Sequence, residues 1–510
     1  MKQKICVWIN NNFVQLGVAK YLQDKENFEL YAIVDSTTGI EEIIKNQEIV
    51  KFEKIWYFGN NLNPDDAIDL KYLEKIEKET GIIFSFVASV ERLFYKEFNQ
   101  YYHFQHSEIL SILEKETKFF QSILLNVKFD FILCSPIARH FQYLFYLLAK
   151  DSKIPFLAFE PIRFGDRYII SNGLFLESAK KVKLDGTIER SEEEIKDFLQ
   201  TYKPRKFYKN TNVDEKYKIK KDEKVKALLS FPFAKNVDEQ NFGMMGRTKK
   251  NILLKGLGST QKKLKKKRED YMNENFVKKV SKNENYIYYP LHVEPEKVLH
   301  IGAPLYTDQI AVIRNIAKYL PVNYKLYVKE HPGMEKLGWR EISYFKKLEE
   351  IPNVRLIHPT INTKEIIENC SLVISIRGTS SLEATFYEKP SIVLVEDWGY
   401  SLIPSIRILN NLDELPKSII ESLKMKVKIT DLGKFIDFIE KNSFELDFIH
   451  YQHEIAHRFN YNVGYMKKPE FKLNDLKKLF NEFDELIDTL GNEFIKKMQK
   501  LEIDEENCQV

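Results

Sequence analysis

The feature that most constrains the fold is an alternation of short apolar runs with helix-like segments, which occurs in two separate stretches of the chain. The apolar runs are rich in β-branched and aromatic residues, and the segments between them have helical composition. Strands that alternate with helices indicate βαβ units, and hence a parallel sheet covered by helices on both faces. The sequence therefore predicts two doubly wound, Rossmann-like α/β units.

We expect the first unit over residues 1–205. Its predicted strands are Lys4–Ile9, Leu30–Val34, Lys54–Phe58, Ile82–Val87, Phe129–Cys134 and Ile154–Phe159. Its clearest helical segments are Ser107–Val127 and His140–Ala149.

We expect the second unit over residues 285–415. Its predicted strands are Tyr286–Pro290, Lys325–Lys329, Val354–Ile357, Leu372–Ile376 and Ile392–Val395. Its predicted helices are Thr307–Tyr319, Arg340–Glu349, Thr363–Asn369 and Ser380–Tyr387.

Two further segments complete the predicted organisation. Residues 206–284 are rich in lysine and predict a mainly helical connector, with one strand signal over Val225–Phe233. Residues 416–510 carry only helical signals and predict a helical extension that packs back on the first unit. The apolar contacts expected for this packing are Phe448, Tyr451, Ile455 and Phe459.

Composition narrows the class of protein. At 510 residues the chain is too long for one ordinary core, so several domains are expected. The 78 basic and 74 acidic residues nearly cancel, so the overall charge does not point to a nucleic-acid partner. The four cysteines are scattered, which predicts neither a disulfide framework nor a zinc knuckle and fits a reducing cytoplasm. No apolar run approaches the length of a spanning helix, so we expect a cytoplasmic protein, at most peripheral to a membrane.

The densest positive charge lies in the connector, over residues 261–268. Its cations are Lys262, Lys263, Lys265, Lys266, Lys267 and Arg268. One interpretation is a solvated surface helix, because charge runs usually have that role. The alternative is attraction to anionic lipid headgroups at the inner face of a membrane.

The first candidate site is Lys329-Glu330-His331-Pro332-Gly333, at the end of a predicted strand. Pro332 cannot continue the strand, so the backbone must turn there and leave His331 at the carboxyl edge of the sheet. Its imidazole can donate to a phosphate or ribose oxygen, and Lys329 can add a charge. The alternative is a strand-ending turn in which the histidine caps a neighbour.

The second candidate site follows another strand, as Arg377-Gly378-Thr379-Ser380-Ser381-Leu382-Glu383. We expect Gly378 to allow a close backbone approach and Thr379 or Ser380 to be the N-cap of a helix. Hydroxyl and N–H groups of Thr379, Ser380 and Ser381 at a helix start suit a phosphate. The alternative is an ordinary helix start with Glu383 completing a capping box, and both interpretations are compatible.

A third candidate site is the loop that starts at the end of the second unit's first strand, Tyr288-Tyr289-Pro290-Leu291-His292-Val293-Glu294-Pro295-Glu296. His292 and Glu294 lie between two prolines there, where they can position a donor sugar or take part in acid–base chemistry. The alternative is a proline-rich connector with solvated carboxylates.

These sites, in this order and with Glu388-Lys389-Pro390 behind them, resemble the bacterial capsule polysaccharide biosynthesis family. That family includes Kdo transferases and is similar to sialyltransferases that carry a His-Pro motif and a Ser/Thr motif. The resemblance covers residues 285–400, and the N-terminal half only in layout. It implies a GT-B type glycosyltransferase, metal-independent and without cofactor, that transfers Kdo or another acidic keto-sugar from a CMP-linked donor to a lipid-linked glycan. It implies that His331 with Pro332, and Thr379, Ser380 and Ser381, hold the nucleotide phosphate.

The sequence departs from those sialyltransferases in its first unit, where no acidic-acidic-glycine triplet is found for the catalytic base. Glu160 and Asp166, which flank a turn after a predicted strand, are the candidates, with His292 as a third catalytic candidate. Either carboxylate can equally be a surface group.

One motif points elsewhere. His453-Glu454-Ile455-Ala456-His457 spells the zincin pattern, with two histidines on one helical face. It lies in a charged helical tail without a third histidine, although Glu470 or Glu482 could act as a third ligand. We interpret it as a chance match and expect no metal site.

Three other functions remain open from the sequence. A CDP-glycerol-type glycerophosphotransferase would use the same kind of nucleotide site. A sugar-nucleotide epimerase has a similar pair of units but needs no acceptor. A non-catalytic polysaccharide assembly or export component would bind nucleotide without turnover.

Overall fold

The computed structural model describes residues 2–508, apart from positions 26, 37–39, 60–61, 63–66, 96–98, 100–101, 175–189, 202–258, 282, 295–296, 335–339, 398 and 460–470. The predicted strand Val225–Phe233 lies outside the described residues. Among the described helices, none is both long and apolar enough to cross a membrane.

Two sheets form the frame of the molecule. In the part of the chain that is described, seven strands form the first sheet, in the order β13-β6-β5-β4-β1-β2-β3. Its strands are β1 (Gln3–Ile9), β2 (Phe28–Asp35), β3 (Lys54–Phe58), β4 (Phe131–Cys134), β5 (Phe156–Pro161), β6 (Arg167–Asn172) and β13 (Phe444–Glu445). β1 to β5 pair in parallel, whereas β6 and β13 pair antiparallel.

The second sheet is entirely parallel. Counted over the described residues, its six strands have the order β12-β11-β10-β7-β8-β9. They are β7 (Asn285–Pro290), β8 (Tyr324–Lys329), β9 (Val354–Ile357), β10 (Leu372–Ser375), β11 (Ser391–Val393) and β12 (Ile406–Ile408). Numbered from its own first strand this is the order 3-2-1-4-5-6 of a doubly wound nucleotide-binding sheet.

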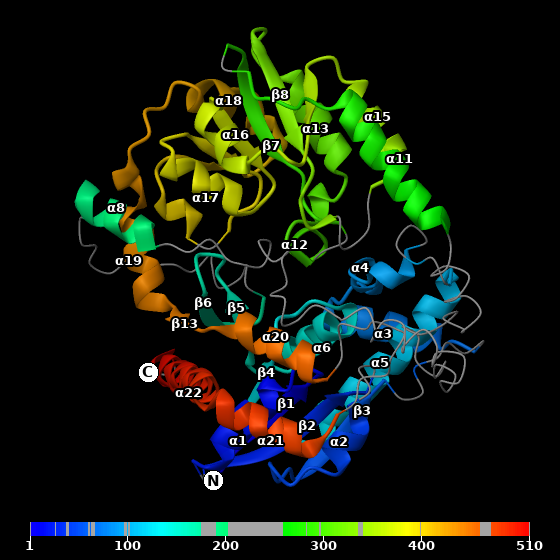
Figure 1. Ribbon diagram of the computed structural model, residues 1–510. Coiled ribbons are helices and arrows are strands. Elements are labelled where there is room, and N and C mark those ends of the chain that lie inside the picture. Colours follow the sequence, from blue (N-terminus) through cyan, green and yellow to red (C-terminus); the bar gives the residue numbers. More distant parts are fainter. Residues whose placement is uncertain are drawn as a thin grey trace.

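Helices cover both sheets (Figure 1). Those of the N-terminal part are α1 (Val14–Gln23), α2 (Glu41–Lys45), α3 (Leu70–Thr80), α4 (Phe84–Ser89), η2 (Arg92–Phe94), α5 (His106–Asn126), α6 (His140–Asp151) and α8 (Glu192–Thr201). Those of the middle part are α11 (Ser259–Asn275), α12 (Lys297–His300), η6 (Pro304–Tyr306), α13 (Gln309–Lys318), α15 (Ile342–Glu349), α16 (Thr363–Asn369) and α17 (Thr379–Phe386). The remainder are η7 (Tyr400–Leu402), η8 (Leu412–Glu414), α18 (Leu415–Ser422), η9 (Ile429–Leu432), α19 (Gly433–Asn442), α20 (Phe448–Arg458), α21 (Leu473–Glu482) and α22 (Asp484–Cys508).

The predicted fold class is confirmed: two Rossmann-like units in a GT-B arrangement, with a helical C-terminal region. Figure 1 shows the two units as separate lobes, with α19 crossing between them and α20, α21 and α22 lying against the N-terminal lobe. Side chains of these last helices share one buried core with β1, β2 and β4. Two glycines allow the close approach of α22 to α1, since a Cβ on Gly491 would lie 2.3 Å from Tyr21 Cδ1 and one on Gly17 would lie 2.8 Å from Ile487 Cδ1.

An apolar cluster also joins the two lobes. It brings Ile162 and Phe164, from the loop after β5, together with Leu382 of α17 and Phe435 of α19. This contact places the carboxyl end of β5 next to the second sheet.

Two predictions about the elements were wrong. The expected strand Ile82–Val87 is the helix α4, because its buried side chains Phe84 and Val87 are three residues apart while Ile83 remains 63% exposed. The expected N-cap at Thr379 or Ser380 is instead Gly378, whose φ of 139° is open to glycine alone, and α17 starts at Thr379.

Candidate functional site

The candidate residues of the second unit gather where its strand order reverses. β7 and β10 are neighbours, yet β8 continues the sheet on one side and β11 on the other. His292 follows β7, Arg377 and Gly378 follow β10, and His331 follows β8. In open α/β sheets this switch point, at the carboxyl ends of the strands, is where ligands bind.

His292 connects the loop after β7 to the turn after β10. Its Nε2 lies in hydrogen-bonding contact with the Arg377 carbonyl, while the Arg377 N–H lies 3.3 Å away. Burial lowers the pKa of His292 to about 4, and the positive charges of Arg163 and Arg340 add to this effect. The ring is therefore neutral near pH 7. It was predicted as a catalytic residue, and the structure places it as a link within the second unit.

A buried ion network fixes the loops after β7 and β8. Arg340 donates to the carboxylate of Glu330 and to the His292 carbonyl, and its Nε lies 3.5 Å from Glu294. Gln309 accepts from the His292 N–H at 2.7 Å and donates to Glu294. Glu294, predicted to bind the donor, is thus held on this network.

His331 has a defined protonation state. Its Nδ1 accepts from the Gly333 N–H at 2.9 Å, so the proton of the neutral ring is on Nε2. Burial lowers the pKa of His331 to about 4, and nearby His292 and Arg340 act in the same direction. The His-Pro turn therefore presents a neutral imidazole whose Nε2 is a donor. Pro332, the next residue, is exposed.

The start of α17 combines a turn with packing. Gly378 carries no side chain, and a Cβ there would lie 3.7 Å from His292 Nε2. Thr379 and Ser380 are partly exposed at the first helical positions. Ser381 is fully buried, and its Oγ lies 2.8 Å from Ser375 Oγ in β10, so it holds the helix onto the strand.

Two other predicted residues lie inside the second unit. Glu383 interacts with Thr379 one turn earlier, and burial raises its pKa. Lys329 donates to the Ile361 carbonyl at 2.6 Å and to Thr363 Oγ1 at 2.9 Å, and burial lowers its pKa to about 8. Lys329 therefore ties β8 to the start of α16.

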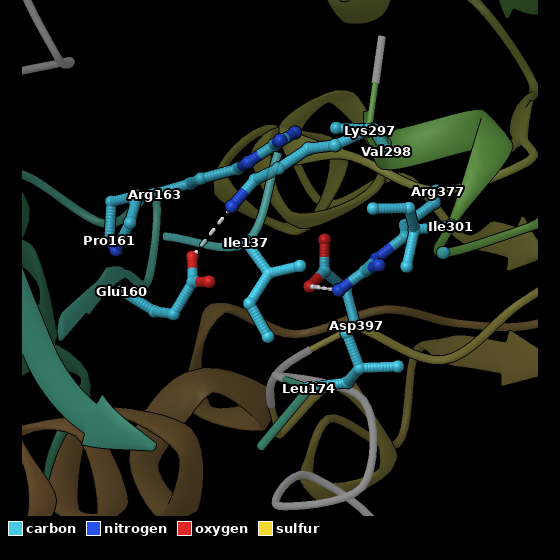
Figure 2. Close-up of a pocket in the computed structure, with 11 residues that line it drawn as sticks. Ile137, Glu160, Pro161, Arg163, Leu174, Lys297, Val298, Ile301, Arg377 and Asp397 are labelled. Carbon is cyan, nitrogen blue, oxygen red and sulfur yellow. Dashed lines mark hydrogen bonds and ion pairs between the residues drawn. The ribbon is translucent and has the colours of Figure 1, made fainter. Parts of the chain in front are cut away.

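A pocket lies between the two units (Figure 2). Its empty volume is about 500 Å³, counting the part open to solvent. The first unit contributes Ile137, Glu160, Pro161, Arg163 and Leu174, and the second contributes Lys297, Val298, Ile301, Gly302, Arg377 and Asp397. Figure 2 shows Lys297 pointing toward Glu160 on one side, and Arg377 with Asp397 on the other.

The structure separates the two predicted catalytic carboxylates. Glu160, at the end of β5, is 5% exposed and accepts from Lys297 Nζ at 2.8 Å across the interface. Asp166 lies in the turn before β6, where its carbonyl accepts from the Leu446 N–H at 3.0 Å, and it does not line the pocket. Only Glu160 is thus placed to meet a substrate between the units.

Gly302, Lys297 and Asp397 line the pocket but were not predicted as site residues. The Arg377 guanidinium pairs with Asp397 Oδ1 at 3.0 Å and occupies the space that Gly302 leaves open. Arg377 was quoted in the second motif without a role. Its partner lies twenty positions later, so no local spacing could reveal the pair.

The first unit has a buried charge network of its own. His140 lies between Glu91, at 2.8 Å from Nδ1, and Glu116, at 3.0 Å from Nε2, and all three side chains are fully buried. Arg139 Nε donates to the same Glu91 oxygen at 2.8 Å. Although burial lowers it, the two carboxylates raise the pKa of His140 to about 9.

The zincin-like segment lies on α20. Glu454 is buried and lies 3.4 Å from Arg458 Nε on the next turn. Phe448, Tyr451, Ile455 and Phe459 belong to the core shared with the first sheet. Among the described residues there is no group of three or more His, Cys, Asp or Glu side chains that could hold a metal ion.

The basic run lies on α11. Lys263, Lys266 and Lys267 are exposed, and Lys265 Nζ lies 3.8 Å from Glu269. The other end of the helix is anchored, since Met272 belongs to the core of the second unit. This arrangement is compatible with both interpretations of the run, the solvated helix and the lipid-binding surface.

Comparison with known families gave a match in the central part of the chain. Residues 193–401 match the model of the capsule polysaccharide biosynthesis proteins. The resemblance to that family is thereby confirmed. The match contains the His-Pro turn and the start of α17 but not the first sheet, so it does not reach Glu160.

Solved structures with similar folds are distant. A beta Kdo 2,4 transferase, KpsC of Thermosulfurimonas dismutans, is 11% identical, with a TM-score of 0.33, over 66% of this chain and 88% of that chain. The UDP-GlcNAc 2-epimerase of Methanocaldococcus jannaschii is 11% identical, with a TM-score of 0.23, over 86% of this chain and 100% of that chain. At these values neither likeness says anything about the chemistry of this chain. Comparison with curated proteins gave no match.

Proposed function

We propose that the chain is a glycosyltransferase of capsule or surface polysaccharide synthesis, which transfers an acidic keto-sugar such as Kdo from a CMP-linked donor. The observation that carries this proposal is the interface pocket. It sets Glu160, of the first unit, opposite the switch point of the second unit, where the family motifs lie. The match to the capsule polysaccharide biosynthesis family supports the biological setting.

In this proposal the second unit binds the nucleotide. The neutral His331 donates from Nε2 to a phosphate oxygen, and the N–H groups at the start of α17 add further donors. Such fixed donors stabilise the negative charge that develops on the departing nucleotide, and we propose that they do so without a metal. Transfer should then survive treatment with EDTA.

The first unit supplies the base. Glu160 accepts the proton of the acceptor hydroxyl, after Lys297 has moved from its carboxylate to the incoming anion. The acceptor would be a lipid-linked glycan, which the exposed lysines of α11 would help to approach at the inner face of a membrane.

The test is a donor panel read by mass spectrometry, with CMP-Kdo, CDP-glycerol and UDP-linked sugars offered together with glycan acceptors. We expect transfer from CMP-Kdo. Glu160→Gln should lower the rate about 100-fold to 10,000-fold, as expected for a general base, and Asp166→Asn much less. Transfer from CDP-glycerol would indicate a glycerophosphotransferase instead, and an equal loss in both variants would remove Glu160 from its proposed role.

A further inference from the structure

Five charged side chains are among the described residues that line the interface pocket. Arg163, Lys297 and Arg377 line it together with Glu160 and Asp397, so cations outnumber carboxylates. The residues assigned to the nucleotide, His331 and the start of α17, are not among the described residues that line it. In the proposed function, this pocket would take the transferred sugar rather than the nucleotide.

Arg377 is the most firmly held of these cations. It is 7% exposed, its Nη2 lies 3.0 Å from Asp397 Oδ1, and Asp397 is itself 5% exposed. Gly302 makes room for it, because a Cβ at that position would lie 2.4 Å from Arg377 Nη1 and 2.5 Å from the Val298 carbonyl oxygen. A guanidinium fixed in this way has lost its rotamer freedom before any ligand arrives.

The chemistry of arginine indicates the ligand. A guanidinium carries five N–H donors in a planar fork that matches the two oxygens of a carboxylate, and Arg377 meets Asp397 through Nη2. Besides Asp397, a neutral sugar would offer the guanidinium only hydroxyl oxygens. An acidic group would supply both charge and fork geometry.

We infer that Arg377, positioned by Asp397 in the space left by Gly302, binds the carboxylate of the transferred sugar and selects acidic over neutral donors. This inference rests on the proposed function, because it assigns the sugar half of the same site. The nucleotide phosphate is the other anion that Arg377 could meet, and the test separates the two.

The test compares the KM for CMP-Kdo with the inhibition constant for CMP in the double variant Arg377→Gln/Asp397→Asn, which removes the pair without leaving one buried charge alone. We expect the KM to rise about tenfold to a hundredfold, the usual effect of losing a charge-assisted hydrogen bond, and CMP inhibition to stay within about twofold. Arg407→Gln/Glu421→Gln is the matched control, a surface pair of the same unit whose loss should change neither constant.

Arg377→Lys serves as a second variant if the double variant does not fold, because it keeps a charge opposite Asp397 but loses the fork. If the KM for CMP-Kdo and the inhibition constant for CMP rise by the same factor, Arg377 binds the phosphate and the inference is overturned. No change in either constant would also overturn it. If the unmodified protein binds no CMP, that result contradicts the proposed function and therefore also the inference that rests on it.

Discussion

At the scale of single residues, the site depends on histidines whose protonation states are set by their surroundings. His292 and His331 lie among arginines and are neutral near pH 7, whereas His140 lies between two carboxylates and is charged. The same side chain therefore has opposite states in the two units.

Replacing His331 by alanine should remove one donor to the leaving nucleotide. We expect the barrier for transfer to rise by about 2 to 4 kcal/mol, because a fixed donor stabilises charge only as it develops. His358→Ala is the control, since His358-Pro359 is a second His-Pro pair, after the edge strand β9. Steady-state kinetics of both variants decide the matter, and an unaltered rate in His331→Ala would contradict the nucleotide role.

His140 should make stability depend on pH. Folding raises its pKa from 6.5 to about 9, so its stabilisation is complete below pH 6.5 and is lost as the pH rises through about 9. The free energy of unfolding should fall by about 3 kcal/mol over that window. Urea unfolding at several pH values measures this, with His140→Gln as the variant that lacks the effect. The same slope in both proteins would show that the carboxylates do not hold the proton.

At the scale of elements, most of the parallel strands were predictable because they are rich in apolar residues, whereas the parallel strand β12 was not predicted. Strands β3 and β9 and helix α16 have the predicted bounds. β6 was not predicted, because the sequence before and within Arg167–Asn172 was interpreted as a loop. Its antiparallel pairing with β5 depends on tertiary contacts. The apolar run that became α4 shows the same limit, because only the packing surface decides between helical and extended periodicity.

The candidate site likewise contains residues that were predictable from the sequence and residues that were not. His331 and the start of α17 were predictable because they follow strands at a sheet edge. The Arg377–Asp397 and Lys297–Glu160 pairs were not, because each joins residues from different elements.

Helix α11 gives an element-scale prediction. Lys265→Gln, Lys266→Gln and Lys267→Gln together should weaken binding to vesicles rich in anionic lipid, because each nearby cation adds roughly 1 kcal/mol at low salt. Activity on a soluble acceptor should not change, since the run lies away from the residues that line the pocket. Vesicle co-sedimentation is the measurement, and equal binding by the variant would favour the solvated helix.

At the scale of the whole molecule, two α/β units face each other across a pocket. The first unit brings the carboxyl end of β5 to it, and the second brings Arg377 at the switch point of its sheet. The C-terminal helices pack on the first unit, so the chain crosses between the lobes more than once (Figure 1). Function then needs a ligand that reaches both units, with the nucleotide on the second and the reacting hydroxyl near the first.

The most direct test of this account is the thermal unfolding midpoint measured with CMP, CDP, UDP and GDP, for the unmodified protein and for His331→Ala. A ligand that binds only the native state raises its stability, by about 2.7 kcal/mol at a hundred times its dissociation constant. We predict that CMP raises the midpoint most, and that His331→Ala loses most of this shift. A midpoint that no nucleotide changes, or an equal CMP shift in both proteins, would contradict the assignment of the nucleotide site.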